Sequence, residues 1–177
     1  MESAGWLTVT AAFISPLPVD VWGVVPCSGR SSRMGTPKAM LDAGGWTFLE
    51  RVINSLRGGG CGRVLVSLPT STGPVAAKAR AAGASVVENP YPEEGPIGSL
   101  RAALATVELE VEGVAFCPVD HPLIQAETVR SLVIKFGDTE GPLVVPTFKG
   151  KRGHPVLFRR SLFDELIAPE LPEGART

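Results

Sequence analysis

The stretch VWGVVPCSGRSSRMGTPKAML, residues 21–41, is the main evidence for the fold that we predict from the sequence. It opens with an apolar run around Val24 and Val25, which is typical of a strand buried on both faces. A segment containing Gly29 and Gly35 follows, and glycine lets a backbone bend tightly and point N–H groups at an anion. This stretch therefore predicts a strand that leads into a phosphate-binding loop.

The loop also carries hydroxyl donors and positive charges that suit a polyanion. These side chains are Ser28, Arg30, Ser31, Ser32, Arg33 and Lys38. A P-loop is excluded, because its lysine follows the last glycine directly and Lys38 stands behind Thr36 and Pro37. The dinucleotide fingerprint is excluded as well, since it needs three glycines spaced as GxGxxG. A surface loop with solvated arginines is the alternative to a phosphate site.

Length and composition are those of one globular domain. The chain has 177 residues, of which 44% are hydrophobic and 20% charged, and a formal net charge of −1. This balance provides no overall attraction to nucleic acid or to an anionic membrane, so neither is expected as a partner. Cys27, Cys61 and Cys117 form no CxxC motif, and no apolar run approaches the ~20 residues of a bilayer span. We therefore expect a cytoplasmic protein without a disulfide framework.

The loop resembles the signature of the small nucleotidyltransferases with a Rossmann-like fold, LAAGxSxRMGxPKxLL. The matching residues are Gly29, Ser31, Arg33, Met34, Gly35, Pro37, Lys38 and Leu41. Pro26, Cys27 and Ser28 replace the Leu-Ala-Ala that usually opens the signature, where the family approaches the base and ribose. The resemblance thus implies an NTP site, and the departure affects the choice of base more than the binding of phosphate.

Apolar runs and helical periodicities alternate along the rest of the chain. Strands are expected at 63–68, 84–87, 113–117, 142–145 and 156–158, and helices at 47–56, 73–82, 126–136, 162–167 and just after Gly98. This order predicts a three-layer α/β/α sandwich with a Rossmann-like, mainly parallel sheet, the fold of the nucleotide-diphospho-sugar transferases that the resemblance implies. Residues 1–20 are expected to form an N-terminal extension and residues 21–177 the nucleotidyltransferase domain.

Gly95 and Gly98 stand just ahead of an expected helix that carries Leu100, which puts Ser99 near the helix N-terminus. Free N–H groups and the helix dipole favour an anion or a polar ligand edge there. In the family that the loop resembles, the corresponding segment from the glycine to Ser-Leu lines the nucleotide pocket, usually with Met where Pro96 stands here. The resemblance implies that Gly95 and Ser99 bind the nucleotide, and a plain helix cap is the alternative.

Asp120 follows the expected strand 113–117 and opens the turn Asp-His-Pro. Ligands of open parallel sheets bind at the carboxyl ends of the strands, and a carboxylate opposite a basic phosphate loop suits Mg²⁺. The turn is similar to the family's metal-binding Asp-Gln-Pro, with His121 where Gln is common. We expect Asp120 to bind Mg²⁺ or, as the alternative, to cap the next helix. His121 is expected to be a structural or hydrogen-bonding residue.

A basic segment with Lys149, Lys151 and Arg152 precedes Gly153-His154-Pro155. Composition alone favours a solvated surface. Its Arg-Gly-His-Pro sequence, followed by an apolar strand, resembles a turn of the molybdenum cofactor cytidylyltransferases and their close relatives, which implies that Arg152 and His154 bind the acceptor. The domain is expected to lack the strand and acidic turn with which family members normally continue.

The resemblance implies transfer of a nucleoside monophosphate from an NTP to a phosphorylated acceptor, with release of pyrophosphate. It assigns charge stabilisation to Arg33 and Lys38 and Mg²⁺ to Asp120. The implied nucleotide-binding residues are Cys27, Ser28, Gly29, Arg30, Ser31, Ser32, Gly35, Gly95 and Ser99. The implied donor is CTP and the implied acceptor molybdopterin cofactor, with a molybdoenzyme as recipient of the product. Guanylyl transfer to the same cofactor, transfer to a sugar phosphate and a non-catalytic nucleotide- or cofactor-binding accessory protein are the alternatives.

Overall fold

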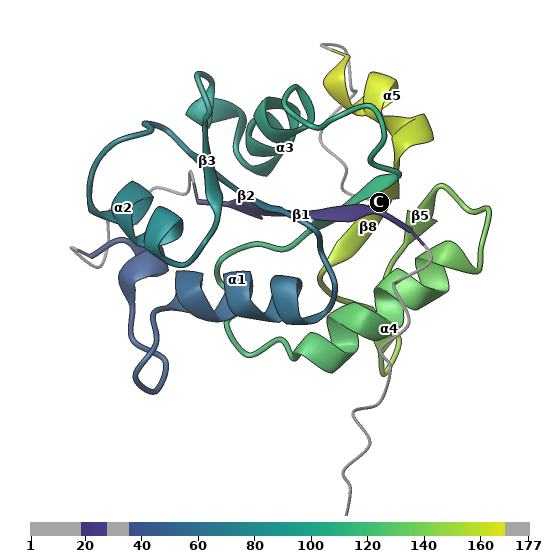
Figure 1. Ribbon diagram of the computed structural model, residues 1–177, viewed down its shortest axis with the longest axis horizontal. Coiled ribbons are helices and arrows are strands. Elements are labelled where there is room, and N and C mark those ends of the chain that lie inside the picture. The colour runs from purple at the N-terminus through teal and green to yellow at the C-terminus, as the bar shows by residue number, and fades with distance from the viewer. Residues whose placement is uncertain (1–18, 28–35, 169–177) are drawn as a thin grey trace, which may run out of the picture.

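In the computed structural model, which describes residues 19–27 and 36–168, a six-stranded sheet separates two layers of helices (Figure 1). Its strand order is β3-β2-β1-β4-β8-β5, with β1 to β4 parallel and β8 antiparallel to both of its neighbours. The strands are β1 Val21–Pro26, β2 Val64–Leu68, β3 Ser85–Glu88, β4 Gly113–Phe116, β5 Leu143–Val144 and β8 Val156–Arg159. The predicted three-layer α/β/α fold with a mainly parallel sheet is confirmed.

Helices cover both faces of this sheet (Figure 1). One layer consists of α1 Phe48–Gly58, α2 Pro74–Ala81 and α4 Ala126–Gly137, and the other of α3 Pro96–Leu104 and α5 Phe163–Ile167. Short 3₁₀ helices are η1 Lys38–Met40, η2 Pro92–Glu94 and η3 Arg160–Leu162. The limits of most elements differ from the expected ones by about one or two residues, as is usual at element ends.

The side chains of β1 enter two separate core clusters. Val21 and Val25 pack with the layer of α1, α2 and α4, whereas Trp22 and Val24 pack with α3 and α5. Successive side chains of a strand point to opposite faces, so an uninterrupted apolar run suits a strand that is covered on both sides. All of β1 is buried, as expected for an apolar strand that lies in the middle of the sheet between β2 and β4.

Thr47 begins α1 in the way that the sequence indicates. Its hydroxyl accepts a hydrogen bond from the Glu50 N–H, and the Glu50 carboxylate accepts one from the Thr47 N–H at 2.8 Å. The Thr47 N–H and the Thr47 hydroxyl, which donates to the same carboxylate oxygen at 2.7 Å, lower the pKa of Glu50, together with Lys78 at 3.3 Å. The capping box therefore fixes the start of α1, and the ion pair with Lys78 links α1 to α2.

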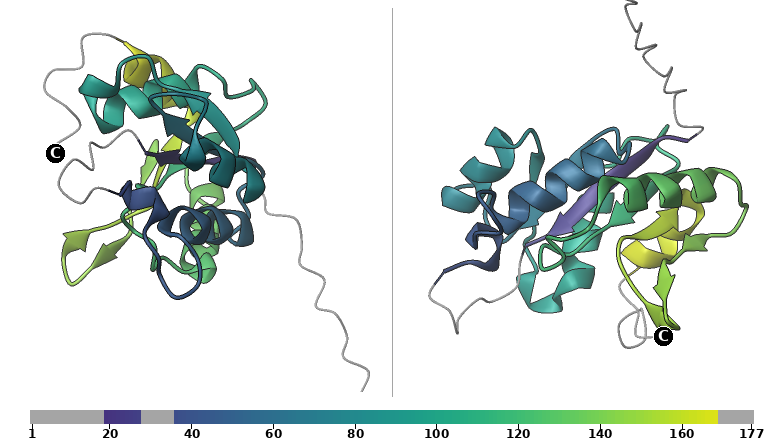
Figure 2. Two further views of the ribbon diagram at one scale, coloured as in Figure 1. Left: turned by 90° about the vertical axis from the view of Figure 1, so that its left-hand side faces the viewer. Right: turned by 90° about the horizontal axis from the view of Figure 1, so that it is seen from below.

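The segment between β5 and β8 forms a separate two-stranded ribbon, β6 Thr147–Phe148 and β7 Lys151–Arg152. Lys149 and Gly150 form its turn with φ values of 50° and 75°, as a two-residue hairpin turn requires. The yellow-green ribbon projects from the body of the domain (Figure 2). The basic segment predicted from the sequence is therefore an exposed hairpin, and the chain after it re-enters the sheet as β8.

Gly113→Ala is expected to destabilise the domain by about 1–3 kcal/mol, the usual cost of overpacking a core. A Cβ at Gly113 would lie 2.5 Å from Phe136 Cζ and 2.7 Å from the Phe158 carbonyl oxygen. Urea unfolding followed by circular dichroism measures the change. Gly141→Ala is the control, because its nearest contact would be Thr139 Oγ1 at 3.4 Å. Equal free energies of unfolding for the two variants would contradict the prediction.

Candidate functional site

The carboxyl ends of the parallel strands meet at one edge of the sheet, where ligands of open α/β sheets bind. Cys27 follows β1, Asn89 follows β3 and Asp120 lies shortly after β4. Because β8 is antiparallel to β4, and Val156 lies opposite Phe116, the turn before β8 reaches the same edge. The edge thus combines the predicted strand ends with a turn from much later in the chain.

Lys38 and Asp120 face each other at this edge. Lys38 Nζ lies 3.8 Å from Asp120 Oδ2, and the two side chains are 52% and 51% exposed. Ala39 is buried and anchors η1 to the core next to Lys38. The alternative role of Asp120 as a cap of α4 is wrong, because Gln125 occupies the N-cap position of that helix. A cation and a carboxylate that both remain accessible are therefore available to a charged ligand.

Two histidines lie beside this pair. His121 Nε2 is 3.8 Å from Asp120 Oδ1, and the ring centroids of His121 and His154 are 4.5 Å apart. Burial, and then the neighbouring His121, lowers the pKa of His154, while Asp120 acts in the opposite direction. The structure thus brings His154, predicted to bind the acceptor, next to the turn that carries Asp120.

His154 is expected to titrate below its ordinary pKa of 6.5. The unfolded chain therefore takes up this proton at a higher pH than the folded chain. Stability that is fully present well above 6.5 is lost as the pH falls below that value and through the lower pKa of the folded state. The chain has 2 histidines. An NMR titration therefore shows two imidazole signals, and the spectrum of His121→Asn assigns each signal to its residue. His121→Asn should raise the midpoint of His154, because it removes a neighbouring cation. A wild-type midpoint above 6.5 would contradict the expectation.

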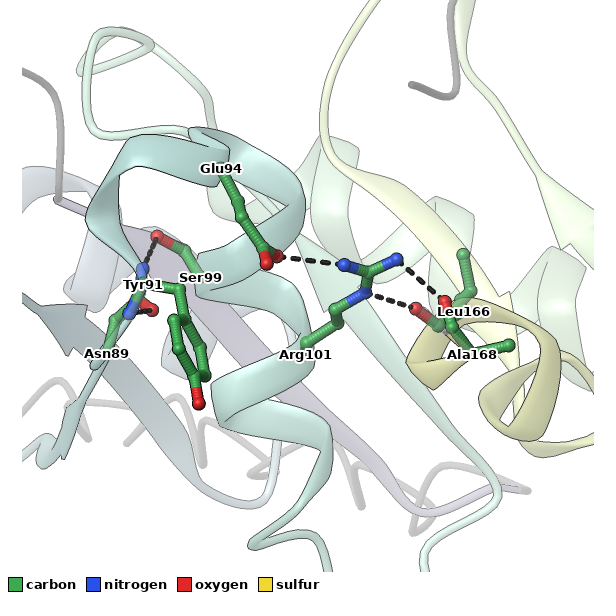
Figure 3. Close-up of polar contacts among 7 residues, drawn as sticks. All are labelled: Asn89, Tyr91, Glu94, Ser99, Arg101, Leu166 and Ala168. Atoms are coloured by element: carbon green, nitrogen blue, oxygen red, sulfur yellow. Dashed lines mark hydrogen bonds and ion pairs between the residues drawn. The ribbon is translucent and has the colours of Figure 1, made fainter. Parts of the chain in front are cut away.

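The predicted nucleotide residues of α3 differ in how they are placed. Gly95 is the N-cap, with φ at 67°, and Pro96 opens the helix, so Gly98 lies within the first turn and not ahead of it. Ser99 is no helix cap: it is fully buried, and its Oγ lies 3.4 Å from Asn89 Nδ2 (Figure 3). Ser99 therefore supports Asn89 from inside the domain, and its direct contact with a nucleotide stays a prediction.

Asn89 is a residue of this edge that the sequence did not single out. It is fully buried, its Oδ1 accepts a hydrogen bond from the Tyr91 N–H at 2.9 Å, and its own N–H donates to the Leu68 carbonyl at 2.7 Å. Asn89 therefore ties the end of β3 to the segment before α3. The Asn-Pro pair directly after a strand is the signal that identifies such a residue, because Asn bonds to the backbone two residues on.

Most of the predicted phosphate loop lies outside the described residues. These positions are Ser28, Gly29, Arg30, Ser31, Ser32, Arg33 and Gly35. Cys27 precedes them, and its N–H donates to the Ser67 carbonyl at 2.9 Å. Burial raises the pKa of the Cys27 thiol to about 12, so the thiol carries no charge. Arg152 lies exposed on β7, close in sequence to His154. The binding roles of all these residues stay predictions.

Residues 23–177 match the family described as MobA-like NTP transferase domain. The chain belongs to this family. A relative from Rhizobium meliloti (strain 1021), named molybdenum cofactor guanylyltransferase, is 34% identical over 151 residues, which cover 82% of this chain and 66% of that protein. The chain spans about half to two thirds of the length of the curated relatives that it matches first.

Solved structures show the same fold for this MobA-like NTP transferase domain. The crystal structure of Rv0371c from Mycobacterium tuberculosis H37Rv is 32% identical, with a TM-score of 0.71 over 85% of this chain and 76% of that chain. The structure of Rv0371c in complex with manganese is 29% identical, with a TM-score of 0.66 over 84% of this chain and 76% of that chain. The relative from Rhizobium meliloti is named for guanylyl transfer, whereas the sequence resemblance implied CTP as the donor.

Two further observations concern the part of this MobA-like NTP transferase domain that the structure describes. Within residues 19–27 and 36–168, no group of three or more His, Cys, Asp or Glu side chains is arranged to hold a metal ion. No helix in the same ranges has the length and apolar character of a membrane span.

Proposed function

We propose that this domain transfers a guanylyl group from GTP to the phosphate of molybdopterin cofactor and releases pyrophosphate. The observation that carries the proposal is the approach of Lys38 to Asp120, 3.8 Å apart at the carboxyl edge of the sheet. Both residues belong to motifs that the resemblance assigns to phosphate and metal binding. Their proximity is what a nucleotide with a bound cation requires, because one group neutralises phosphate and the other binds the cation.

The choice of GTP follows from relatives and not from the geometry. The relative from Rhizobium meliloti that covers 82% of this chain is named molybdenum cofactor guanylyltransferase, and the same name is given to one from Xanthomonas euvesicatoria. CTP is the competing donor, since the atypical Pro26-Cys27-Ser28 segment stands where the family approaches the base. Molybdopterin cofactor is the acceptor in both cases.

The reaction needs positioning and charge neutralisation more than a protein nucleophile. An oxygen of the acceptor phosphate attacks the α-phosphorus of GTP and forms a new P–O bond. The bond from that phosphorus to the bridging oxygen breaks, and its electron pair leaves with pyrophosphate. Lys38 neutralises the charge that develops on the phosphates, and the backbone of residues 28–35 orients them, with Arg33 as a second cation.

Asp120 fits a divalent cation such as Mg²⁺. Its carboxylate is a hard oxygen ligand, half exposed, and in the described residues no further acidic cluster surrounds it. The GTP phosphates would supply the remaining ligands, and the ion would offset the charge on them. The manganese complex of Rv0371c supports a cation in this fold. We therefore assign Asp120 as a protein ligand for the metal ion that would accompany the nucleotide.

His154 and Arg152 are the proposed acceptor residues. His154 lies beside His121 and Asp120, with a lowered pKa that keeps its imidazole neutral at neutral pH. A neutral imidazole can donate one hydrogen bond and accept another, and it would not repel a Mg²⁺ ion held by Asp120. Arg152 lies exposed on β7 and supplies a charge for the acceptor phosphate.

Pyrophosphate release from GTP, CTP, ATP and UTP, each with Mg²⁺ and purified molybdopterin cofactor, tests the proposal. Release that depends on GTP supports it, and release that depends on CTP moves the protein to cytidylyl transfer. Binding of an NTP without any release supports the accessory-protein alternative. If no NTP binds, the assignment of the loop at residues 28–35 is wrong.

A further inference from the structure

Arg101, in α3, donates hydrogen bonds to three acceptors. Its Nη1 donates to Glu94 Oε2 at 2.8 Å, its Nε to the Leu166 carbonyl at 3.0 Å and its Nη2 to the Ala168 carbonyl at 2.7 Å. Figure 3 shows the guanidinium between Glu94 on one side and the end of α5 on the other. Because the donors of a guanidinium form a rigid planar fork, these contacts hold η2, α3 and α5 in one arrangement.

The ion pair of Arg101 with Glu94 is better shielded than an ordinary surface pair. The two side chains are 20% and 36% exposed. Arg63 and Glu108 also form an ion pair, at 3.2 Å, but are 51% and 58% exposed. Water and salt screen exposed pairs, so that many of them contribute little. Of these two pairs, the contact of Arg101 with Glu94 is therefore the one expected to have a measurable effect.

Glu94 is followed directly by the first turn of α3. It ends η2 and precedes Gly95, the residue with positive φ that begins the helix. The turn packs closely on this segment, because a Cβ at Gly98 would lie 2.6 Å from the Tyr91 carbonyl oxygen and 2.9 Å from Glu94 Cβ. A displacement of Glu94 therefore displaces the first turn, whose N–H groups lack acceptors within the helix.

We propose that Arg101 is a positioning residue for the nucleotide, acting through Glu94 on the segment from Tyr91 to Ser99. The inference rests on the proposed function and on the expectation, implied by the sequence resemblance, that Gly95 and Ser99 belong to the nucleotide site. The carbonyls at the end of α5 fix the guanidinium, and the guanidinium in turn fixes Glu94. Asn89 holds the other end of the segment by accepting a hydrogen bond from the Tyr91 N–H.

The transfer chemistry lies elsewhere on the sheet edge. Asp120 follows β4, whereas the segment from Tyr91 to Ser99 follows β3, and β2 and β1 lie between these two strands. Loss of the contact between Arg101 and Glu94 should therefore weaken the binding of the nucleotide while the rate of the bound complex changes little. This separation of binding from turnover is what a positioning role predicts.

Arg101→Ala in the full chain is expected to raise the Kd for GTP, or for CTP if that is the donor, about tenfold. This factor is typical of the loss of one charge-assisted hydrogen bond. The kcat for pyrophosphate release should stay within about threefold of the wild-type value. Arg101→Lys keeps the charge near Glu94 and should recover part of the affinity. Arg63→Ala is the matched control, and it should leave the Kd unchanged.

A double-mutant cycle separates this role from a general loss of stability. If Arg101 acts through Glu94, the variant that combines Arg101→Ala with Glu94→Ala should have the same Kd as Glu94→Ala alone. If Arg101→Ala unfolds the domain, Glu94→Gln keeps the test available, because it removes the charge and preserves the shape. Thermal unfolding of each variant shows whether its fold is intact.

Three outcomes would overturn the inference. An unchanged Kd for Arg101→Ala or Glu94→Gln in a folded variant would show that the contact does not position the nucleotide. Additive effects of the two substitutions on the Kd would show that Arg101 does not act through Glu94. If the wild-type protein binds no NTP, both the proposed function and the inference fail, whereas normal wild-type binding with unaffected variants overturns only the inference.

Discussion

Asp120→Asn is expected to reduce the rate of pyrophosphate release by about 10³-fold or more at saturating GTP and Mg²⁺. The substitution keeps the size of the side chain but removes the charge that would bind the cation beside Lys38. Because Asp120 is half exposed and its contact with Lys38 is 3.8 Å long, the fold should not depend on it. Steady-state pyrophosphate release over a range of Mg²⁺ concentrations measures the effect.

Asp138→Asn is the matched control for this substitution. Asp138 is an exposed carboxylate at the C-cap of α4, away from the edge that carries Asp120. The rate of pyrophosphate release by Asp138→Asn should equal that of the wild type. Asp120→Asn and Asp138→Asn should both have the wild-type melting temperature. A rate for Asp120→Asn within tenfold of the wild type would remove Asp120 from the metal site and with it the proposed arrangement of the reaction.

Lys38→Met is expected to reduce kcat by about 10²- to 10³-fold, the usual cost of losing one group that stabilises transition-state charge. Methionine preserves much of the length of the side chain and removes only the charge, so the packing of η1 should be maintained. Lys38→Arg should retain part of the activity. The melting temperature should change by little, because an exposed ion pair contributes only about 0–1 kcal/mol.

Lys135→Met controls for the loss of a surface charge. Lys135 is exposed in the last turn of α4, and its substitution should not affect turnover. A wild-type kcat for Lys38→Met combined with a raised KM would indicate that Lys38 contributes equally to ground-state and transition-state binding. That outcome would overturn its assignment to catalysis while leaving it in the phosphate site.

Local sequence determined the elements and the two faces of the sheet. The apolar run around Val24 predicts a strand covered on both sides, and β1 is buried throughout. Thr47 and Glu50 define the start of α1, because a capping box depends only on residues three positions apart. The alternation of strands and helices then leaves few topologies, since parallel crossovers are right-handed and short. The sheet edge that carries Asp120 follows from these rules.

The partners of individual side chains were decided only by the tertiary structure. His121 and His154 are far apart in sequence, and nothing local indicates that their rings lie 4.5 Å apart. Their approach depends on β8 running antiparallel to β4, which is a long-range pairing. Hydrophobic periodicity tells which face of an element is buried, but it does not identify the element that covers it.

The segment before α3 also separates what local sequence determines from what the tertiary structure decides. The sequence places Ser99 near a helix start, but Pro96 begins the helix early, and the serine turns inward to Asn89. In the sequence, Arg101 is only one more charged residue in an expected helix. Its three acceptors are determined by the position of α5, which packs on α3 through apolar side chains from distant parts of the chain. Sequence by itself determined which strands and helices form and where their ends meet; the packing of distant elements decided which side chains meet there, because such contacts depend on the whole fold and not on local spacing.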